Sequence, residues 1–390
     1  MESDIAQPST GIFSDRILNS IALGHFIIDL LNGQRSLLLA YLSVLMGLSN
    51  YGLGIMTLAY VVSSALAQPV FGYIADRFGA RWVAAGGVLW MGTFFSLAMV
   101  FPGWPALGFL ILASIASGAF HPAGAMEATM AGRHRMNGRE TTSSGLFFLF
   151  GQMGFGFGPM LGGPLLHLWG MPGLLLLSVF AFPVGGFASR ALRFLPEPVH
   201  HAEKKTTGKV VISGALLLMV GISAFESWSQ SNITAYMPRY LVQFNLSPSI
   251  YGMIIGLFTA GSAIGCVIGG QLADRFNRKS VIVGSLVLAA IPLTIMAAVG
   301  YSPWLYPLMF ISGLLTGGPF SVIIVQAQKV IPSGMGLASG LTMGFIFSAG
   351  AIGTMFTGKL ADVWGYQAIF YMTALIAMTA GLLGLFLKKD

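Results

Sequence analysis

The decamer GYIADRFGAR at residues 72–81 recurs as GQLADRFNRK at residues 270–279, about half a chain later. Each copy follows one long apolar segment and precedes the next one. Because the same polar turn separates apolar segments twice, the sequence predicts a duplicated membrane protein. The acidic positions of the two copies are Asp76 and Asp274, and the basic positions that follow them are Arg77, Arg81, Arg275 and Arg278.

The composition places the chain in lipid. Of its 390 residues, 55% are hydrophobic and only 8% are charged, and the mean hydropathy is +0.79. A soluble domain of this composition would lack the polar residues that cover a surface. Crossing a bilayer takes roughly 20 apolar residues. We therefore predict an all-α membrane protein with twelve transmembrane helices, near residues 18–46, 49–74, 82–101, 104–127, 141–166, 171–194, 210–243, 249–273, 279–299, 303–328, 335–360 and 365–387.

The distribution of basic residues predicts the orientation. With an even number of spans, both termini lie on one side, and most of the 20 Lys and Arg residues fall on that side. The positive-inside rule makes that side cytoplasmic. The first apolar segment is too long for a cleaved signal and is expected to remain. The net charge of +7 follows from this topology and requires no nucleic-acid partner. We expect a monomer in the lipid bilayer.

A hydrophilic stretch divides the chain. Residues 195–209 are predicted to form a cytoplasmic linker between an N-terminal bundle, 1–194, and a C-terminal bundle, 210–390. His200 and His201 lie in this stretch, but adjacent residues point in different directions and no third ligand is near, so a solvated linker is favoured over a metal site. Cys266 is the single cysteine, which excludes an internal disulfide and a multi-cysteine metal site. No cofactor or metal is expected.

Weaker repeats occur inside each half. The octamer GPLLHLWG at 163–170 is echoed by GKLADVWG at 358–365, and each closes a glycine-rich segment. Together with the two decamers, these octamers show that four segments, the second and the fifth of each half, end in a similar turn. This pattern is typical of halves built from inverted three-helix repeats.

The doubled G-x-x-x-D-R loop resembles the signature of the major facilitator superfamily. The resemblance implies two six-helix bundles in which the aspartate of each loop caps a helix N-terminus and the basic residues pair across to the other half, latching the outward-open state. A carboxylate is favoured at the positive end of a helix dipole, and arginine suits carboxylates and helix-end carbonyls. Ordinary positive-inside charge would explain the basic residues alone.

A second motif lies in the fifth apolar segment, where Gly145, Gly154, Gly158, Pro159 and the pair at 162–163 follow a regular spacing. This spacing resembles a motif of exporters and antiporters in the superfamily. Small residues let helix backbones approach closely and proline bends a helix, so Gly154, Gly158 and Pro159 are predicted to form a contact around which the halves pivot. A generic close-packed glycine face is the alternative.

Finer features follow in several segments: H-x-x-x-D at 25–29, Q-P-x-x-G-Y at 68–73, F-H-P at 120–122 and P-F-S at 319–321. They resemble the fosmidomycin-resistance branch of bacterial drug exporters. That resemblance implies proton-driven extrusion of small organic compounds across the bacterial inner membrane. The fourth segment lacks the buried arginine of many drug–proton antiporters, and His121 stands in that neighbourhood instead.

Ionisable residues within apolar segments point to the functional site. Each charged residue there costs roughly 2.5–3.5 kcal/mol unless it is paired or hydrated. His25 and Asp29 are four residues apart and share a helix face. We predict that they pair and, with His121 and Glu226, carry the coupled proton. A purely structural polar cluster is the alternative reading.

Substrate contacts are predicted on both halves. Glu226 occupies nearly the same place in its half as Asp29 in the other, so it is expected to bind substrate or the proton. Arg35 is expected to anchor the substrate or pair with Asp29, with snorkelling toward the outer surface as the alternative. The full predicted set is Asn32, Arg35, Gln152, Glu226, Trp228, Gln230 and Asn232. Glu127, close to Arg133 and Arg135, is predicted to form an ion pair that closes the cytoplasmic gate.

These observations favour a proton-coupled antiporter that exports small drug-like or amphipathic compounds by alternating access. A proton-coupled importer of an organic acid or another small nutrient, with Arg35 as the anion anchor, is the alternative on the same fold. An enzyme is disfavoured, because the sequence shows no nucleophile with a nearby base and no nucleotide-binding loop.

Overall fold

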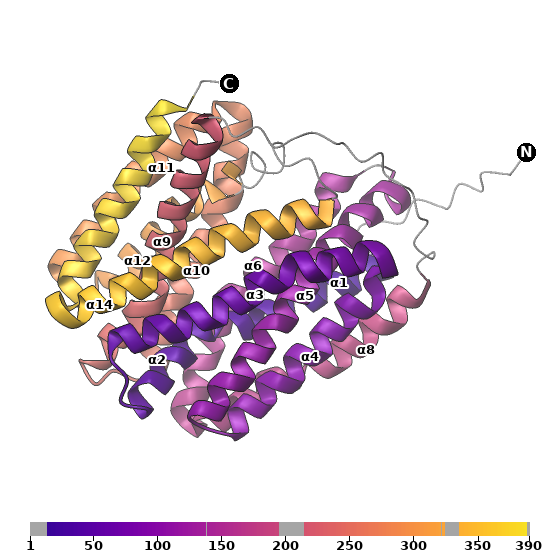
Figure 1. Ribbon diagram of the computed structural model, residues 1–390, viewed down its shortest axis with the longest axis horizontal. Coiled ribbons are helices and arrows are strands. Elements are labelled where there is room, and N and C mark those ends of the chain that lie inside the picture. Colours follow the sequence, from indigo (N-terminus) through magenta and orange to yellow (C-terminus); the bar gives the residue numbers. More distant parts are fainter. Residues whose placement is uncertain (1–13, 138, 195–213, 321, 324–334, 388–390) are drawn as a thin grey trace, which may run out of the picture.

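Two helical bundles make up the molecule, one coloured indigo to pink and the other rose to yellow (Figure 1). The computed structural model describes residues 14–137, 139–194, 214–320, 322–323 and 335–387. Within these ranges there is no β-strand, and eight helices are long and apolar enough to cross a membrane. The predicted all-α membrane fold is confirmed. The predicted linker, 195–209, lies outside the described residues.

The N-terminal bundle follows the first six predicted segments. The first segment is divided at Gln34 into two helices. The helices are α1 (Arg16–Gly33), α2 (Arg35–Leu45), α3 (Asn50–Phe78), α4 (Ala80–Val100), α5 (Trp104–Arg135) and α6 (Glu140–Trp169). The sixth segment is built from shorter pieces: η1 (Met171–Leu174), α7 (Leu175–Ser178), α8 (Ala181–Ala191) and η2 (Leu192–Phe194).

The C-terminal bundle contains α9 (Gly214–Val242), α10 (Pro248–Arg275), α11 (Arg278–Val299), α12 (Leu305–Gly317), α14 (Met335–Leu383) and η3 (Gly384–Phe386). The last two predicted segments both fall in α14. They are divided at Gly365, whose φ of 78° and ψ of 172° are non-helical. Only glycine adopts such a positive φ without steric cost, so this residue allows the chain to reverse between the two arms.

The two decamers mark the boundary between consecutive helices with different residues. In the first, Gly79 has a φ of 89° and its N–H donates to the Ala75 carbonyl at 2.9 Å, which ends α3 before α4 begins. In the second, Asn277 takes the place of glycine and its side chain accepts from the Ser280 N–H at 3.3 Å, capping the start of α11. A side-chain oxygen thus satisfies a helix-end donor.

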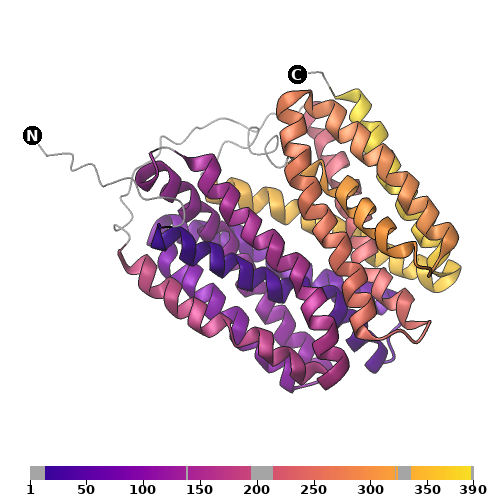
Figure 2. The same cartoon turned by 180° about the vertical axis from the view of Figure 1, so that it is seen from behind.

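The most extensive contacts between the bundles are those of α3 with α14 and of α6 with α10. Seen from behind, the same two bundles stand side by side (Figure 2). In the α6–α10 pair, a Cβ placed on Gly252 would lie only 2.4 Å from the Pro159 carbonyl oxygen. The predicted pivot residue Pro159 therefore faces the opposite half at a close backbone contact.

Two of the motif glycines, Gly154 and Gly158, face α1 in their own half. A Cβ on Gly154 would lie 2.2 Å from the Phe26 carbonyl oxygen, and one on Gly158 would lie 2.5 Å from the Leu30 carbonyl oxygen. Gly145, at the start of the motif, has nothing within 4 Å of such a Cβ. These contacts hold α6 against the stretch of α1 that carries His25 and Asp29.

We expect Gly154→Ala to destabilise the protein by about 1–3 kcal/mol, because the added methyl group forces α1 and α6 apart. Gly145→Ala is the matched control on the same helix and should be neutral or slightly stabilising, since alanine favours a helix over glycine. Thermal unfolding of the purified protein in detergent measures both. Equal melting temperatures for the two variants would show that the α1–α6 contact is not tight.

Candidate functional site

A cavity of about 220 Å³ lies between the two bundles and is lined by residues from both of them. Eight of the residues predicted for proton coupling or substrate binding line it: His25, Asp29, Asn32, Arg35, His121, Gln152, Glu226 and Gln230. Side chains separated by up to 205 positions in the chain therefore meet around one space.

Two predicted substrate residues do not line this cavity. The Trp228 indole N–H donates to the Thr357 hydroxyl at 2.9 Å, and its ring covers Gly353 on α14. Asn232 is fully buried and its amide donates to the Thr373 hydroxyl at 3.1 Å. Both side chains join α9 to α14 within the C-terminal bundle, which corrects their assignment to the substrate site.

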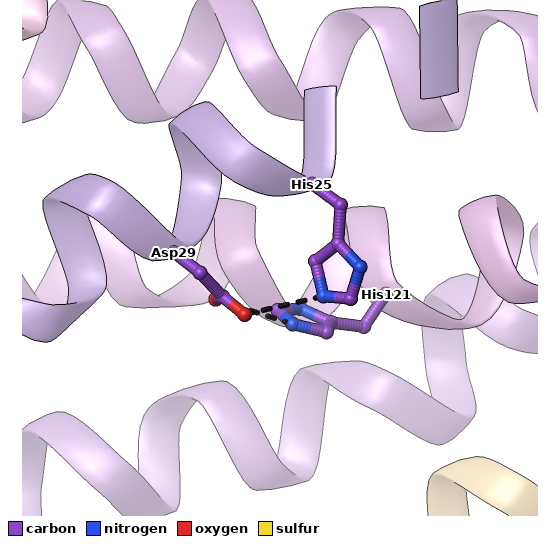
Figure 3. A group of neighbouring side chains, drawn as sticks. All are labelled: His25, Asp29 and His121. Atoms are coloured by element: carbon purple, nitrogen blue, oxygen red, sulfur yellow. Dashed lines mark ion pairs between the residues drawn. The ribbon is translucent and has the colours of Figure 1, made fainter. Parts of the chain in front are cut away.

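On the N-terminal wall, two imidazole rings converge on one carboxylate (Figure 3). His25 Nε2 lies 3.2 Å from one oxygen of Asp29, and His121 Nε2 lies 3.4 Å from the other. The predicted contact of His25 with Asp29 is present, and α5 adds His121 to it. The two rings meet edge to face, with their centroids 4.9 Å apart.

The far side of each ring is held by the backbone. His25 Nδ1 lies 2.8 Å from the Phe147 carbonyl oxygen of α6, and the His25 ring stacks on Phe147 with centroids 4.0 Å apart. His121 Nδ1 lies 2.8 Å from the Ser117 carbonyl oxygen one turn earlier on α5. Three helices, α1, α5 and α6, thus fix the orientation of the cluster formed by His25, Asp29 and His121.

Asn32 connects this cluster to two residues that the sequence did not single out. Its amide donates to the Ser117 hydroxyl at 2.6 Å and to Asp29 at 3.3 Å. The Tyr60 hydroxyl of α3 donates to the Asn32 side-chain oxygen at 2.7 Å. Sequence spacing gave no signal for Tyr60 or Ser117, because each acts through a contact between helices.

Glu226 faces the cavity from the opposite wall. It is 1% exposed, and its carboxylate accepts a hydrogen bond from the Gln230 amide, one turn later on α9. Gln230 also donates to the Thr316 carbonyl at 3.2 Å and accepts from the Ser262 hydroxyl at 3.3 Å. The C-terminal wall therefore presents one carboxyl group set among amide and hydroxyl groups.

Arg35, at the start of α2, lies on the cavity wall with its guanidinium 5.7 Å from the centre of the Tyr60 ring. This cation–π contact and the neighbouring Asp29 place the charge inside the bundle, not toward the outer surface. Aromatic side chains complete the lining, namely Phe148, Phe155, Phe258, Phe320 and Phe347. The cavity thus combines charged groups with apolar ring faces.

The halves are tied together at one end of the molecule. The Asp362 carboxylate, from α14, accepts from the Asn50 and Tyr51 N–H groups at 2.8 and 2.9 Å. These are the first two residues of α3, so a carboxylate from one half caps a helix of the other. Nearby, Arg239 of α9 donates to the Leu48 carbonyl at 3.0 Å. Asp362 belongs to the octamer at 358–365, the weaker echo of the decamers.

The decamer loops lie in the connections α3–α4 and α10–α11. Arg77 donates to the Tyr73 hydroxyl at 2.9 Å, and Arg81 donates to the Ser189 carbonyl at 3.2 Å. Both contacts stay within the N-terminal half. Asp76 and Arg275 are exposed, and Arg278 begins α11. The side chain of Asp274 lies outside the described part of the structure, so the predicted latch remains a prediction.

Glu127 does not pair with Arg135 as predicted. Arg135 instead binds Asp15 at the start of α1, with 2.6 Å between Nε and a carboxylate oxygen. Asp15 also accepts from the Leu18 N–H at 2.7 Å, so this residue caps α1 and joins it to the end of α5. Glu127 is 7% exposed, and its Oε2 atom has no hydrogen-bond partner among the described residues.

The sequence predicted no metal site. The nitrogen and oxygen atoms of His25, Asp29 and His121 lie within 4.8 Å of one another, close enough for one ion to bridge them. The same nitrogen–oxygen separations, 3.2 and 3.4 Å, also suit a proton held in each contact.

Comparisons with known proteins agree with this architecture. The model of the Major Facilitator Superfamily matches residues 21–354 and 216–390. The fosmidomycin resistance protein of Escherichia coli (strain K12) is 29% identical, over 96% of this chain and 93% of that protein. A multi-drug resistance efflux pump of Streptococcus pneumoniae serotype 4 is 25% identical, over 84% of this chain and 86% of that protein.

Among solved structures, a bacterial homolog of the human lysosomal transporter Spinster superposes with a TM-score of 0.78, at 12% identity and over 96% of this chain and 97% of that one. The chain belongs to the major facilitator superfamily. The family and these relatives are transporters, and the chain is a multi-pass membrane protein.

Proposed function

We propose that this member of the superfamily is a proton-coupled antiporter that exports small drug-like or amphipathic organic compounds across the bacterial inner membrane by alternating access. The observation that supports it best is the cluster of His25, Asp29 and His121 on the wall of a cavity between the halves. A proton and a solute can then influence each other's binding in one space. The names of two relatives, a fosmidomycin resistance protein and a multi-drug efflux pump, favour export.

The gating part of the proposal follows from the positive-inside rule. With the decamer loops, the linker and both termini in the cytoplasm, the contacts of Asp362 with α3 lie at the periplasmic end. The described conformation is then inward-facing, with its periplasmic end closed by Asp362 and Arg239. In the outward-open state, the loops carrying Asp76 and Asp274 would form the predicted latch.

Transport into inverted membrane vesicles tests the proposal. The assay drives uptake with an imposed pH gradient and uses a panel of fosmidomycin, amphipathic dyes and organic acids. We expect at least one amphipathic compound to accumulate with counterflow of protons. Uptake that needs no gradient, or accumulation only in right-side-out vesicles, would contradict proton-driven export.

Import of an organic acid is the second candidate. Arg35 supports it, because this guanidinium lines the cavity and forms no ion pair with a carboxylate among the described residues. An anionic substrate would supply that partner. Accumulation of organic acids in right-side-out vesicles, lost in Arg35→Gln, would favour this function over export.

Glu226→Gln separates the two roles proposed for that carboxyl group. The substitution keeps its size but removes the charge. If Glu226 recognises cationic compounds, their apparent affinity falls about tenfold, or ~1.4 kcal/mol, while neutral compounds are unaffected. If Glu226 carries the coupled proton, gradient-driven uptake of both kinds falls alike. Initial uptake rates for matched cationic and neutral dyes distinguish these results, and an unchanged rate for both contradicts both roles.

A further inference from the structure

The hydrogen bonds to the backbone fix which ring nitrogen carries hydrogen in both histidines of the cluster. A peptide carbonyl oxygen only accepts hydrogen bonds. Nδ1 of His25 lies 2.8 Å from the Phe147 carbonyl oxygen, and Nδ1 of His121 lies 2.8 Å from the Ser117 carbonyl oxygen and 3.3 Å from the Ser117 hydroxyl. Two lone pairs would repel each other at the 2.8 Å contacts, so we assign the hydrogen of each neutral ring to Nδ1. In its neutral form each ring therefore turns an Nε2 lone pair toward Asp29 (Figure 3).

This arrangement sets the proton count of the cluster. A lone pair that faces a carboxylate oxygen is repelled, so each nitrogen–oxygen contact requires one proton. With two protons in the two contacts the cluster is fully hydrogen-bonded and carries a net charge of +1. With one proton it is neutral, and with none it is −1. The neutral state leaves one contact without its proton and the −1 state leaves both, so repulsion between lone pairs favours exchange between the first two states.

The charged groups nearby affect how strongly the second proton is held. Arg35, on α2, is the cation that interacts with Asp29, and it opposes the second proton. Tyr60 faces the cluster from α3, and Glu226 is the carboxyl group across the cavity on α9. The cavity-lining residues from α6, α10 and α14 are uncharged. We therefore expect the cluster to exchange one proton, the second, which it holds weakly.

The two contacts differ in their access to water. The side chain of His25 is 3% exposed and packs against Phe147 and Phe120, whereas the side chain of His121 is 20% exposed. The two contacts also differ in whether the Asp29 oxygen keeps another hydrogen-bond donor after the proton leaves. The Asp29 oxygen that faces His121 also accepts from the Asn32 amide at 3.3 Å, so it keeps a donor. The oxygen that faces His25 has that ring as its hydrogen-bonding partner.

We propose that His121 carries the exchangeable proton and that His25 is a positioning residue, which keeps its proton and holds Asp29 in place. This assignment rests on the proposed proton coupling. On release, the Nε2–H bond of the His121 imidazolium breaks, its electron pair stays on Nε2, and the proton passes to a water molecule in the cavity. Uptake reverses this step. The charge of the cluster then alternates between +1 and 0.

The test uses protons alone as the probe. The protein is labelled with ¹⁵N in its six histidines, purified in detergent with EDTA, and followed by NMR across the neutral pH range. The matched variants are His25→Gln and His121→Gln, because a glutamine amide supplies a permanent donor in place of Nε2–H. His167→Gln, at the exposed end of α6, is the control.

We expect the His121 signal to titrate in the wild type and in His25→Gln, while the His25 signal keeps the shift of a ring protonated at both nitrogens. In His121→Gln no histidine of the cluster titrates. Titration of His25 in the wild type, or a titrating His25 in His121→Gln, overturns the assignment. If one variant fails to fold, the other still assigns the two wild-type signals.

A transport assay separates this inference from the proposed function. His25→Gln should keep the dependence of uptake on the pH gradient but transport at a lower rate, because His25 positions Asp29, whereas His167→Gln should leave uptake unchanged. His121→Gln should lose the gradient dependence but keep exchange of that compound without a gradient. Absence of proton-driven uptake in the wild type would refute the proposed function, whereas equal loss in both variants would refute only the division of roles.

Discussion

Asp29→Asn abolishes transport driven by a pH gradient, with an expected loss of roughly 100-fold, at the lower end of what a positioned proton-transfer group contributes. The carboxylate supplies the negative charge that balances the protons of His25 and His121, and an amide of the same shape cannot carry it. Without that charge, two neutral rings meet one amide and the cluster no longer gains or loses a proton. Proton movement is followed with a pH-sensitive dye inside proteoliposomes.

The same preparation contains the control for folding. Because asparagine keeps the size of the side chain and can still contact Asn32, exchange of labelled substrate in the absence of a gradient should persist in Asp29→Asn. The melting temperature should change little. Full gradient-driven transport by this variant would remove Asp29 from the coupling mechanism, whatever role Glu226 then takes.

We expect Asp362→Ala to shift the transporter from the proposed inward-facing state toward the outward-open state. The substitution removes the two hydrogen bonds to the Asn50 and Tyr51 N–H groups and the charge at the start of α3. Loss of a helix cap costs about 0.5–2 kcal/mol, and ~1.4 kcal/mol changes an equilibrium tenfold. We therefore expect about a tenfold change in the ratio of the two states.

Cys266 reports this shift, because it is the single cysteine of the chain and lines the cavity. In inverted vesicles a membrane-impermeant maleimide should label the wild type faster than Asp362→Ala, and in right-side-out vesicles the order should reverse. Lys359→Ala is the matched control, since Lys359 is exposed one turn earlier on the same helix. Labelling rates that match the wild type in both orientations would show that Asp362 does not hold the gate closed.

The largest departures from the sequence predictions concern the direction of side chains. Trp228 and Asn232 are close to Glu226 in the sequence, yet they face α14 while Glu226 faces the cavity. A rotation of α9 about its axis decides which of them meets the substrate, and α9 is apolar enough around its circumference that composition does not fix that rotation. The pairing of Arg135 with Asp15 likewise depends on where two helix ends meet.

The sequence by itself determined the membrane environment and the all-α fold. The physical reason is that lipid offers no hydrogen-bonding partners, so long apolar segments must satisfy their own backbone as helices, and polar turns must separate them. It also determined that His25 and Asp29 share a face, since that follows from their spacing of four along a helix.

Only the tertiary structure decided that His121 completes this pair, that the Phe147 and Ser117 carbonyls fix both rings, and that Asp362 caps a helix 312 positions away. These contacts join residues on different helices. They depend on the rotation and offset of each helix against its neighbours, which are set by close packing at positions such as Gly154 and Gly252 and not by hydropathy.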